Sequence, residues 1–334
     1  MKNQSFKALQ VSETLGNNFQ SEIVTRSIMD LPDGEILIRV LFSSLNFKDA
    51  LSASGNKGVT RSYPHTPGID AAGIIVSSDV AEFSEGDEVI VTGYDLGMNT
   101  PGGFGEYIRV PSGWVVKRSS GLSLRDSMIL GTAGVTAALC VEKLLNAGMQ
   151  RECGEIIVTG ATGGVGIISV AILSSLGFSV VASTGKISEK YFLESIGVSR
   201  VIEREELAES SSRPLLKEKW AGAIDVVGGT TLVNVLKSLK YGASVAACGL
   251  VQSPSLEATV LPFILRGINL LGVDSVEQPR AVKEGVWEKL ASEWKIEDLS
   301  AICTEISFDS LQDNLDKILA GKVTGRILLN LDPS

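Results

Sequence analysis

Glycines gathered between an apolar run and a helix-like segment are the residues best suited to chemistry in this chain. VTGATGGVG occupies residues 158–166, and an apolar helix-like run follows. Gly163 is expected to make a tight turn open to a ligand, and Gly166 to let the helix pack on the sheet. Helix-start N–H groups favour anions, so the Ala161–Gly166 turn predicts a pyrophosphate site. Without a ligand, the same glycines would form only a tight strand–helix connection.

The next strand-like run indicates which dinucleotide would bind. An NAD site is expected to carry Asp or Glu here, about 20 residues past the glycines, for the ribose 2′-hydroxyl. The chain instead has Ser183, Thr184, Gly185 and Lys186, and Arg204 follows the third strand. Hydroxyls and cations would bind a 2′-phosphate that a carboxylate would repel, which predicts NADPH. The alternative is that Lys186 and Arg204 are solvated loop charges.

Elements able to position these residues alternate along the middle of the chain. Short apolar strands are expected at 155–160, 179–184, 200–203, 223–228, 243–249 and 268–274. Helices are expected at 165–176, 188–196, 205–209, 230–239 and 260–266. This alternation predicts a parallel sheet covered on both faces. Before about residue 125, short β-branched runs separated by Gly, Pro and Asp predict a small β-barrel or sandwich.

Composition narrows the range of partners and locations. The chain has 334 residues, which favours two domains, and a net charge of −9. This acidity argues against nucleic acid or an anionic membrane as the main partner. The N-terminal residues carry no apolar signal-like run, so the cytoplasm is the expected location. Four scattered cysteines without a C-x-x-C pair are expected to be reduced thiols there.

A set of segments in one order runs along nearly the whole chain. They are SSLNFKDAL (43–51), PGIDAAG (67–73), GTAGVTAALCV (131–141), VTGATGGVG (158–166), TGK (184–186), WAGAIDVVGG (220–229), YGASVAACGL (241–250), PFILRGINLLGVDSV (262–276) and GKVTGRILL (321–329). In these segments the chain resembles the medium-chain dehydrogenase/reductase superfamily, specifically its zinc-free quinone-oxidoreductase side. More narrowly, it resembles the bacterial NADPH-dependent acrylyl-CoA reductases.

The resemblance implies an α/β fold of two domains. A GroES-like β-barrel domain would comprise residues 1–124, completed by 295–334. A Rossmann domain with a doubly wound parallel sheet would comprise residues 125–294 and bind NADPH. These boundaries agree with the change from β-rich to alternating patterns near residue 125.

Zinc relatives place a Cys and a Gly-His-Glu motif where this chain reads SSLNFKD and PGIDAAG. They also carry a four-Cys lobe, whereas residues 90–115 contain no Cys. Tetrahedral zinc needs three or four converging N, S or O ligands, and His65 is the only histidine. No metal site is therefore expected, and His65 is interpreted as a loop residue.

The resemblance also carries over cofactor contacts where the motifs match. Phe47 stands where relatives often have Tyr near the nicotinamide, so any hydrogen bond through that hydroxyl is lost. Asp70 corresponds to the metal-ligand region of zinc relatives and is expected near the cleft. The further contacts implied by the resemblance are Thr162, Gly163, Gly164 and Val165 at the pyrophosphate, Thr184, Gly185, Lys186 and Arg204 at the 2′-phosphate, Leu250, Ile264 and Ser275 at the nicotinamide end, and Arg326 returning from the C-terminal segment.

With no metal or obvious nucleophile, the expected chemistry is hydride delivery from the nicotinamide. Hydride addition to an α,β-unsaturated thioester leaves an enolate oxygen that needs donors and a Cα that needs a proton. Asn46 could donate an amide N–H, and Lys48 could stabilise the negative charge. Asp49 could orient Lys48 or cap the following helix, and capping is the favoured reading. Water remains a candidate proton donor.

Three functions fit this pattern. The favoured one is NADPH-dependent reduction of a 2-enoyl-CoA, with acrylyl-CoA as the preferred substrate. Quinone or small-enone reduction would use the same machinery, and a non-catalytic NADPH-binding sensor would need the glycine turn alone. The apolar segment INLLGVDS (268–275) is expected at the sheet edge, where it would pair with a second copy in a homodimer.

Overall fold

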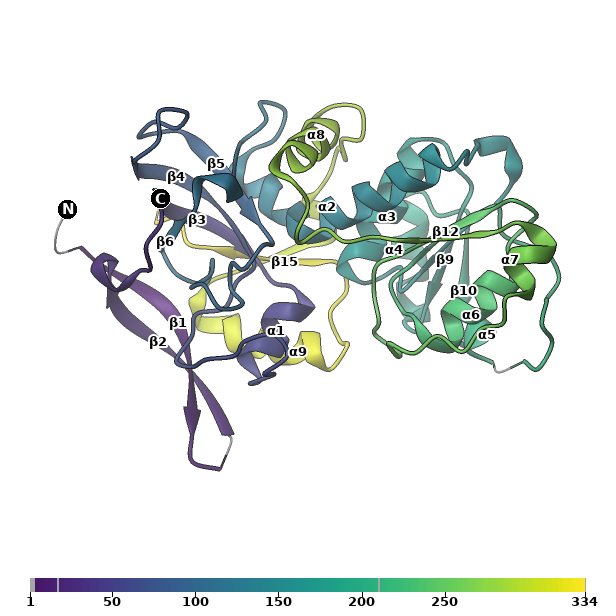
Figure 1. Cartoon of the computed structure of the whole chain (residues 1–334), viewed down its shortest axis with the longest axis horizontal. Coiled ribbons are helices and arrows are strands. Elements are labelled where there is room, and N and C mark those ends of the chain that lie inside the picture. Colours follow the sequence, from purple (N-terminus) through teal and green to yellow (C-terminus); the bar gives the residue numbers. More distant parts are fainter. Residues whose placement is uncertain (1–3, 17, 210, 334) are drawn as a thin grey trace. The chain divides into compact units, whose positions relative to one another are not determined.

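The computed structural model describes residues 4–16, 18–209 and 211–333, and it forms two compact units (Figure 1). The first unit draws its described residues from Met1–Thr132, Val276–Ser292 and Glu297–Ser334. The second unit comprises Ala133–Ser275 and Glu293–Ile296. Each unit is described on its own below.

The second unit is built on a six-stranded parallel sheet. Its strands are β8 (Ile156–Thr159), β9 (Val180–Thr184), β10 (Arg200–Glu203), β11 (Gly222–Asp225), β12 (Ser244–Ala247) and β13 (Asn269–Gly272). Their order is β10-β9-β8-β11-β12-β13, and each neighbouring pair is parallel. This is the strand order of a Rossmann sheet, which confirms the expected doubly wound fold. β13 lies at one edge, as its apolar sequence led us to expect.

Helices connect these strands and cover the sheet. They are α3 (Gly164–Ser175), α4 (Lys190–Ser195), α5 (Glu205–Ala208), α6 (Gly229–Ser238) and α7 (Leu261–Arg266). α3 packs against β8 and β9 and is buried from Gly166 through Leu173. A helix that is apolar on all sides needs such burial, which is why its sequence lacks a polar face.

The hydrophobic core of the second unit joins the sheet to the helices on it. Ile157, Val181 and Val245 from three strands pack with Val235 and Leu236 of α6, and all five are fully buried. Removing this apolar area from water is the main favourable term in folding the unit.

The first unit contains a two-stranded ribbon and a seven-stranded sheet. The strands are β1 (Ser5–Thr14), β2 (Asn18–Ser27), β3 (Ile36–Ser44), β4 (Asp70–Ser78), β5 (Glu88–Thr92), β6 (Tyr107–Val110), β7 (Val115–Lys117), β14 (Cys303–Ile306) and β15 (Arg326–Asn330). β1 pairs with β2, and the larger sheet runs β14-β15-β3-β4-β5-β7, with β6 also on β3. The C-terminal strand β15 pairs antiparallel with β3, so both ends of the chain build this unit (Figure 1).

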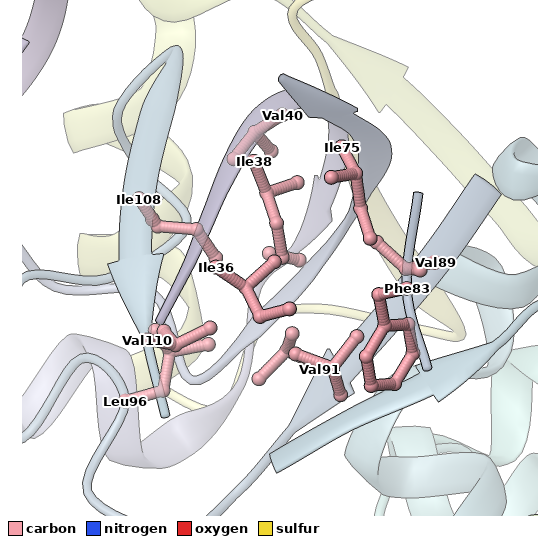
Figure 2. Close-up of a cluster of buried hydrophobic side chains, with 12 residues drawn as sticks. Ile36, Ile38, Val40, Ile75, Phe83, Val89, Val91, Leu96, Ile108 and Val110 are labelled. Carbon is pink, nitrogen blue, oxygen red and sulfur yellow. The ribbon is translucent and has the colours of Figure 1, made fainter. Parts of the chain in front are cut away.

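Apolar side chains from several strands fill the interior of this sheet (Figure 2). Ile36 and Ile38 of β3 lie beside Ile108 of β6 and Val91 of β5, and all four are buried. Residues two apart on a strand face the same side, so Ile36 and Ile38 both face this core, whereas Leu37 between them packs in a separate core cluster.

Four helices belong wholly or partly to the first unit. They are α1 (Phe47–Ala53), α2 (Leu124–Asn146), α8 (Arg280–Ala291) and α9 (Leu311–Leu319). Short 3₁₀ helices lie at Ile28–Asp30, Ser112–Trp114, Arg151–Cys153, Ile187–Glu189, Ser300–Ile302 and Phe308–Ser310. α2 is long and apolar enough to cross a membrane, but 78% of its most apolar stretch is buried, so it is a core helix.

The unit boundaries differ from those expected at residues 124 and 295. The first division falls inside α2, one residue after a kink at Gly131, where φ is 51° and ψ is −154°. α8 belongs to the first unit, where it packs against β7, and its buried Lys283 donates to Thr92 O at 2.6 Å and Val276 O at 2.9 Å. A buried ammonium group needs such acceptors. The sequence of α8 does not show that the acceptors of Lys283 lie in the first unit.

Candidate functional site

The glycine turn after β8 lies at the expected place in the fold, but a different glycine has the left-handed backbone conformation. The left-handed residue is Gly160, with φ +60°, whereas Gly163 has an ordinary φ of −81°. The expectation that Gly163 makes the tight turn is therefore wrong. A Cβ on Gly163 would lie 3.3 Å from Gly160 O, a tight contact with backbone, so the absence of a side chain relieves crowding in this turn.

Gly166 packs the helix onto the strand, as expected. A Cβ there would lie 2.3 Å from Gly160 O and 2.8 Å from Ala161 Cα. Gly164 and Val165 form the first turn of α3 and are half-buried. N–H groups in a first helical turn have no intrahelical acceptor, so this turn can bind an anionic group.

The residues expected to bind a 2′-phosphate gather at the carboxyl end of β9. Thr162 Oγ1 and Thr184 Oγ1 are 3.0 Å apart, and Lys186 N donates to Thr184 Oγ1 at 3.0 Å. Arg204 N donates to Thr184 O at 3.0 Å, which brings the third strand's end to the same place. Partial burial, opposed by nearby Glu189, lowers the pKa of Lys186.

Asp225 is a polar residue of this sheet edge that sequence reasoning missed. It is fully buried at the end of β11, where Oδ1 accepts from Thr159 Oγ1 at 2.7 Å and Oδ2 from Gly228 N at 2.7 Å. Burial raises its pKa, and these hydrogen bonds oppose the rise. Asp225 thus shapes the turn that follows β11. The signal for it was an acid at a strand end, three residues before the first glycine of a Gly-Gly pair.

In the first unit, the central feature is the buried carboxylate of Asp70. Its Oδ2 accepts from Ser44 Oγ at 2.6 Å, Asn46 Nδ2 at 2.8 Å and Thr132 N at 2.9 Å. Its Oδ1 accepts from Thr132 Oγ1 at 2.5 Å. These donors come from the end of β3, the start of α1 and the kink of α2. Asp70 therefore joins β4 to the neighbouring β3–α1 junction and to the distant kink of α2.

Arg326 lies beside this carboxylate rather than on an open face. It is 3% exposed, and it donates from Nε to Ile129 O at 2.8 Å and from Nη1 to Leu45 O at 3.3 Å. Its Nη2 is buried and has no hydrogen-bond partner among the described residues. Burial lowers its pKa, and Asp70 opposes this shift most strongly. In the structure Arg326 therefore connects the C-terminal strand to the backbone of Leu45 and Ile129, and its direct contact with the cofactor stays a prediction.

Asn46 and Asp49 also have internal roles. Asn46 Nδ2 is directed to Asp70, so it is not the free amide donor that we expected. Asp49 Oδ2 accepts from Asn46 N at 2.8 Å, and its Oδ1 accepts from Gly68 N and Ile69 N at 3.1 and 2.8 Å. Capping of α1 is thus confirmed as the role of Asp49, and orientation of Lys48 is not.

The remaining predicted residues differ in exposure. Phe47 is 44% exposed and Lys48 is half-buried in the first turn of α1, where both can face a ligand. In the second unit, Leu250 and Ile264 are 60% and 69% exposed. Ser275 is buried, and its hydroxyl lies 2.7 Å from Thr136 Oγ1, so that hydroxyl is already paired.

We expect Gly131→Ala to destabilise the protein by roughly 2–4 kcal/mol. A Cβ at this left-handed φ would lie 2.4 Å from Ser44 Oγ and 2.5 Å from Asp70 Oδ2. The control is Gly285→Ala in α8, where a Cβ meets nothing within 4 Å and helix propensity favours Ala by up to about 1 kcal/mol. Urea unfolding measures both, and equal stability of the two variants would contradict the prediction.

A second prediction concerns pH. Burial, and next the charge of Asp70, raise the pKa of Asp49 from 3.8 to about 7. The folded state therefore holds this proton more tightly than the unfolded chain, and the resulting stability is lost as pH rises from about 4 to about 7. Asp49→Asn should be less stable than the wild type at pH 5, and the gap in melting temperature should narrow by pH 8. Thermal unfolding at several pH values tests this, and a constant gap would disprove it.

Comparisons with known proteins place the chain in a family. Residues 32–120 match the family model of the alcohol dehydrogenase GroES-like domain, and residues 164–292 match that of zinc-binding dehydrogenases. "Putative quinone oxidoreductase YhfP" of Bacillus subtilis is 43% identical over 98% of this chain and 99% of that protein. Acrylyl-CoA reductase AcuI of Ruegeria pomeroyi is 41% identical over 94% of this chain and 95% of that protein.

Solved structures agree with this placement. The yhdH oxidoreductase of Salmonella enterica, in complex with NADP, matches with a TM-score of 0.94 and 42% identity over 97% of this chain and 99% of that chain. The B. subtilis yhfP structure, with NAD bound, matches with a TM-score of 0.95 and 43% identity over 98% of this chain and 100% of that chain. Both matches extend over both units of the fold.

The zinc implied by one family name does not fit the residues present. Within the part of the chain that the structure describes, no three His, Cys, Asp or Glu side chains come together as a metal site. Asp70 already accepts four hydrogen bonds, and the Arg326 guanidinium lies close enough that a Cβ on Gly131 would meet both. A cation there would be repelled by the guanidinium and would have to displace these donors. With its GroES-like and Rossmann domains, the chain belongs to the medium-chain dehydrogenase/reductase superfamily.

Proposed function

We propose that the protein is an NADPH-dependent oxidoreductase that reduces the C=C bond of an α,β-unsaturated acyl-CoA, with acrylyl-CoA as the substrate. The observation that carries the cofactor assignment is the cluster of Thr184, Lys186 and Arg204 at the end of β9. The substrate is supported by AcuI of R. pomeroyi, an acrylyl-CoA reductase 41% identical to this chain.

NADPH fits the second unit better than NADH does. The turn of Thr162 to Val165 would hold the pyrophosphate at the start of α3, and the cluster after β9 would hold the 2′-phosphate. β9 ends in Thr184 without a carboxylate for a ribose 2′-hydroxyl. The yhdH structure contains NADP whereas the yhfP structure contains NAD, so the shared fold alone does not decide between them.

Bound NADPH would supply a hydride, which adds to Cβ of the substrate while Cα takes a proton. Before Cα takes this proton, the added hydride would leave negative charge on the thioester oxygen, and a nearby cation would stabilise it. Lys48 is the candidate for this role, because it is half-buried in the first turn of α1. Asp49 fixes that turn, which carries Phe47 and Lys48, by accepting from Asn46 N and Ile69 N. The proton would come from water.

Quinone reduction is the second candidate, since the name of YhfP describes that activity and its identity to this chain is 43%. Quinones and enones also accept hydride and leave an oxygen anion, so the same Lys48 would serve them. Binding of NADPH without turnover of any such acceptor would instead support a sensor.

The test is NADPH oxidation with acrylyl-CoA and, separately, with 1,4-benzoquinone. We expect the higher kcat/KM with acrylyl-CoA. Lys48→Met should lower kcat by about 10²-fold, as for loss of one stabilising donor, and leave the Kd of NADPH unchanged. Lys322→Met, at an exposed position of the same unit, is the control. A higher kcat/KM with the quinone would reject acrylyl-CoA as the substrate, and undiminished turnover by Lys48→Met would reject the role of that residue.

We also propose a homodimer formed through the edge strand β13. Exposed apolar side chains lie close to this strand in the sequence, on α7 and before it: Val251, Val260, Ile264 and Leu265 are 55–69% exposed. A bare sheet edge beside exposed apolar residues is suited to a two-fold interface. Together these features make the second unit the part of the chain through which copies would meet.

Light scattering at micromolar concentration should give twice the mass of one chain. Leu265→Asp should lower the measured mass toward that of the monomer, because the dimer interface would then bury a charged carboxylate. Ile187→Asp, at another exposed apolar position of the second unit, is the control. A monodisperse wild-type monomer would exclude the dimer.

A cytoplasmic location completes the proposal. Cys140, Cys153, Cys248 and Cys303 are all free thiols, including the exposed Cys153. Free thiols are typical of a reducing compartment.

A further inference from the structure

Gly185 stands between Thr184 and Lys186, but its backbone does not explain why it is a glycine. Its φ lies outside the left-handed region that side chains avoid. A residue with a side chain could therefore adopt the same conformation without strain. The reason for the glycine must lie in what occupies the space beside it.

That space is taken by the side chain of Arg204. A Cβ on Gly185 would lie 2.6 Å from both Cζ and Nε of Arg204, and 3.0 Å from its Cδ. The guanidinium therefore lies directly against the backbone of Gly185. Every atom that the Cβ would meet closely belongs to this one flexible side chain, so an added methyl group would displace Arg204 and leave the fold intact.

The other restraint on the guanidinium is weak. Arg204 Nε pairs with Glu205 Oε1 at 3.2 Å, but the two side chains are 68% and 66% exposed. Exposed pairs of this kind contribute little. The pair occupies Nε and leaves the two terminal nitrogens of the guanidinium for another partner. The place of the Arg204 side chain thus depends on the space left free beside the backbone of Gly185, between Thr184 and Lys186 in the sequence.

We propose that Gly185 is a specificity-determining positioning residue: its missing side chain seats the Arg204 guanidinium, and this sets the preference for NADPH over NADH. The inference rests on the proposed use of NADPH. Gly185 was expected to contact the cofactor directly. In this proposal it acts on the cofactor only by positioning Arg204.

The chemistry predicts a selective effect. A guanidinium binds phosphate through paired, charge-assisted hydrogen bonds that need a fixed orientation. NADH lacks the 2′-phosphate, so its affinity does not depend on where Arg204 points. Displacing Arg204 should therefore weaken binding of NADPH and spare that of NADH. A general distortion of the site would weaken both.

The experiment measures the Kd of NADPH and of NADH, by calorimetry on the full chain, for a double-mutant cycle. We expect Gly185→Ala and Arg204→Ala each to raise the NADPH Kd by about tenfold or more, and the double variant to match Arg204→Ala alone. The NADH Kd should change less than about twofold throughout. Gly113→Ala, where a Cβ meets nothing within 4 Å, is the control and should alter neither.

Distinct results would overturn the inference. If Gly185→Ala keeps the NADPH preference while Arg204→Ala loses it, Gly185 does not position Arg204. If the two effects add in the double variant, Gly185 acts independently of Arg204. A parallel rise in the NADH Kd would show general damage. If the wild type itself binds NADH as tightly as NADPH, the proposed cofactor fails, and this inference fails with it.

Discussion

The first unit depends on the burial of one carboxylate. Asp70 is inaccessible to water, and a charge in that position is tolerated only when hydrogen bonds and an opposite charge replace the solvent. Ser44, Asn46 and Thr132 supply the hydrogen bonds, and the guanidinium of Arg326 lies close by. Because each donor belongs to a different segment, satisfying this carboxylate fixes the end of β3, the start of α1 and the kink of α2 together.

This arrangement also decides what chemistry is possible. A guanidinium beside a fully hydrogen-bonded carboxylate leaves no place for a divalent cation at Asp70, so no metal ion there would polarise a substrate oxygen. The second unit supplies its binding features on the carboxyl edge of a parallel sheet, where a glycine turn, a helix start and a cluster of hydroxyls and cations meet. The second unit thus has groups suited to bind an anionic cofactor, whereas in the first unit the charges of Asp70 and Arg326 offset each other.

The second unit was largely predictable because its motifs are local. Its six strands lie close to their expected positions, and Thr162, Thr184, Lys186 and Arg204 come together since parallel strands end at one edge. The roles of individual residues were less predictable. Gly160 rather than Gly163 makes the left-handed turn, and Asp225 was overlooked, because backbone angles and cross-strand partners do not show in composition.

The amino-acid sequence by itself determined the alternation of strands and helices, the glycine turn and the absence of an acid at the end of β9, since each depends on residues near one another in the chain. Only the tertiary structure decided the roles of Asn46, Asp49 and Arg326, which bind groups up to 281 positions away. A side chain's hydrogen-bond partners depend on which segments the fold brings together. For that reason Asn46 and Arg326 have protein partners that the sequence did not show, and their expected contacts with substrate and cofactor stay predictions. Asp49 caps α1, which was its favoured role.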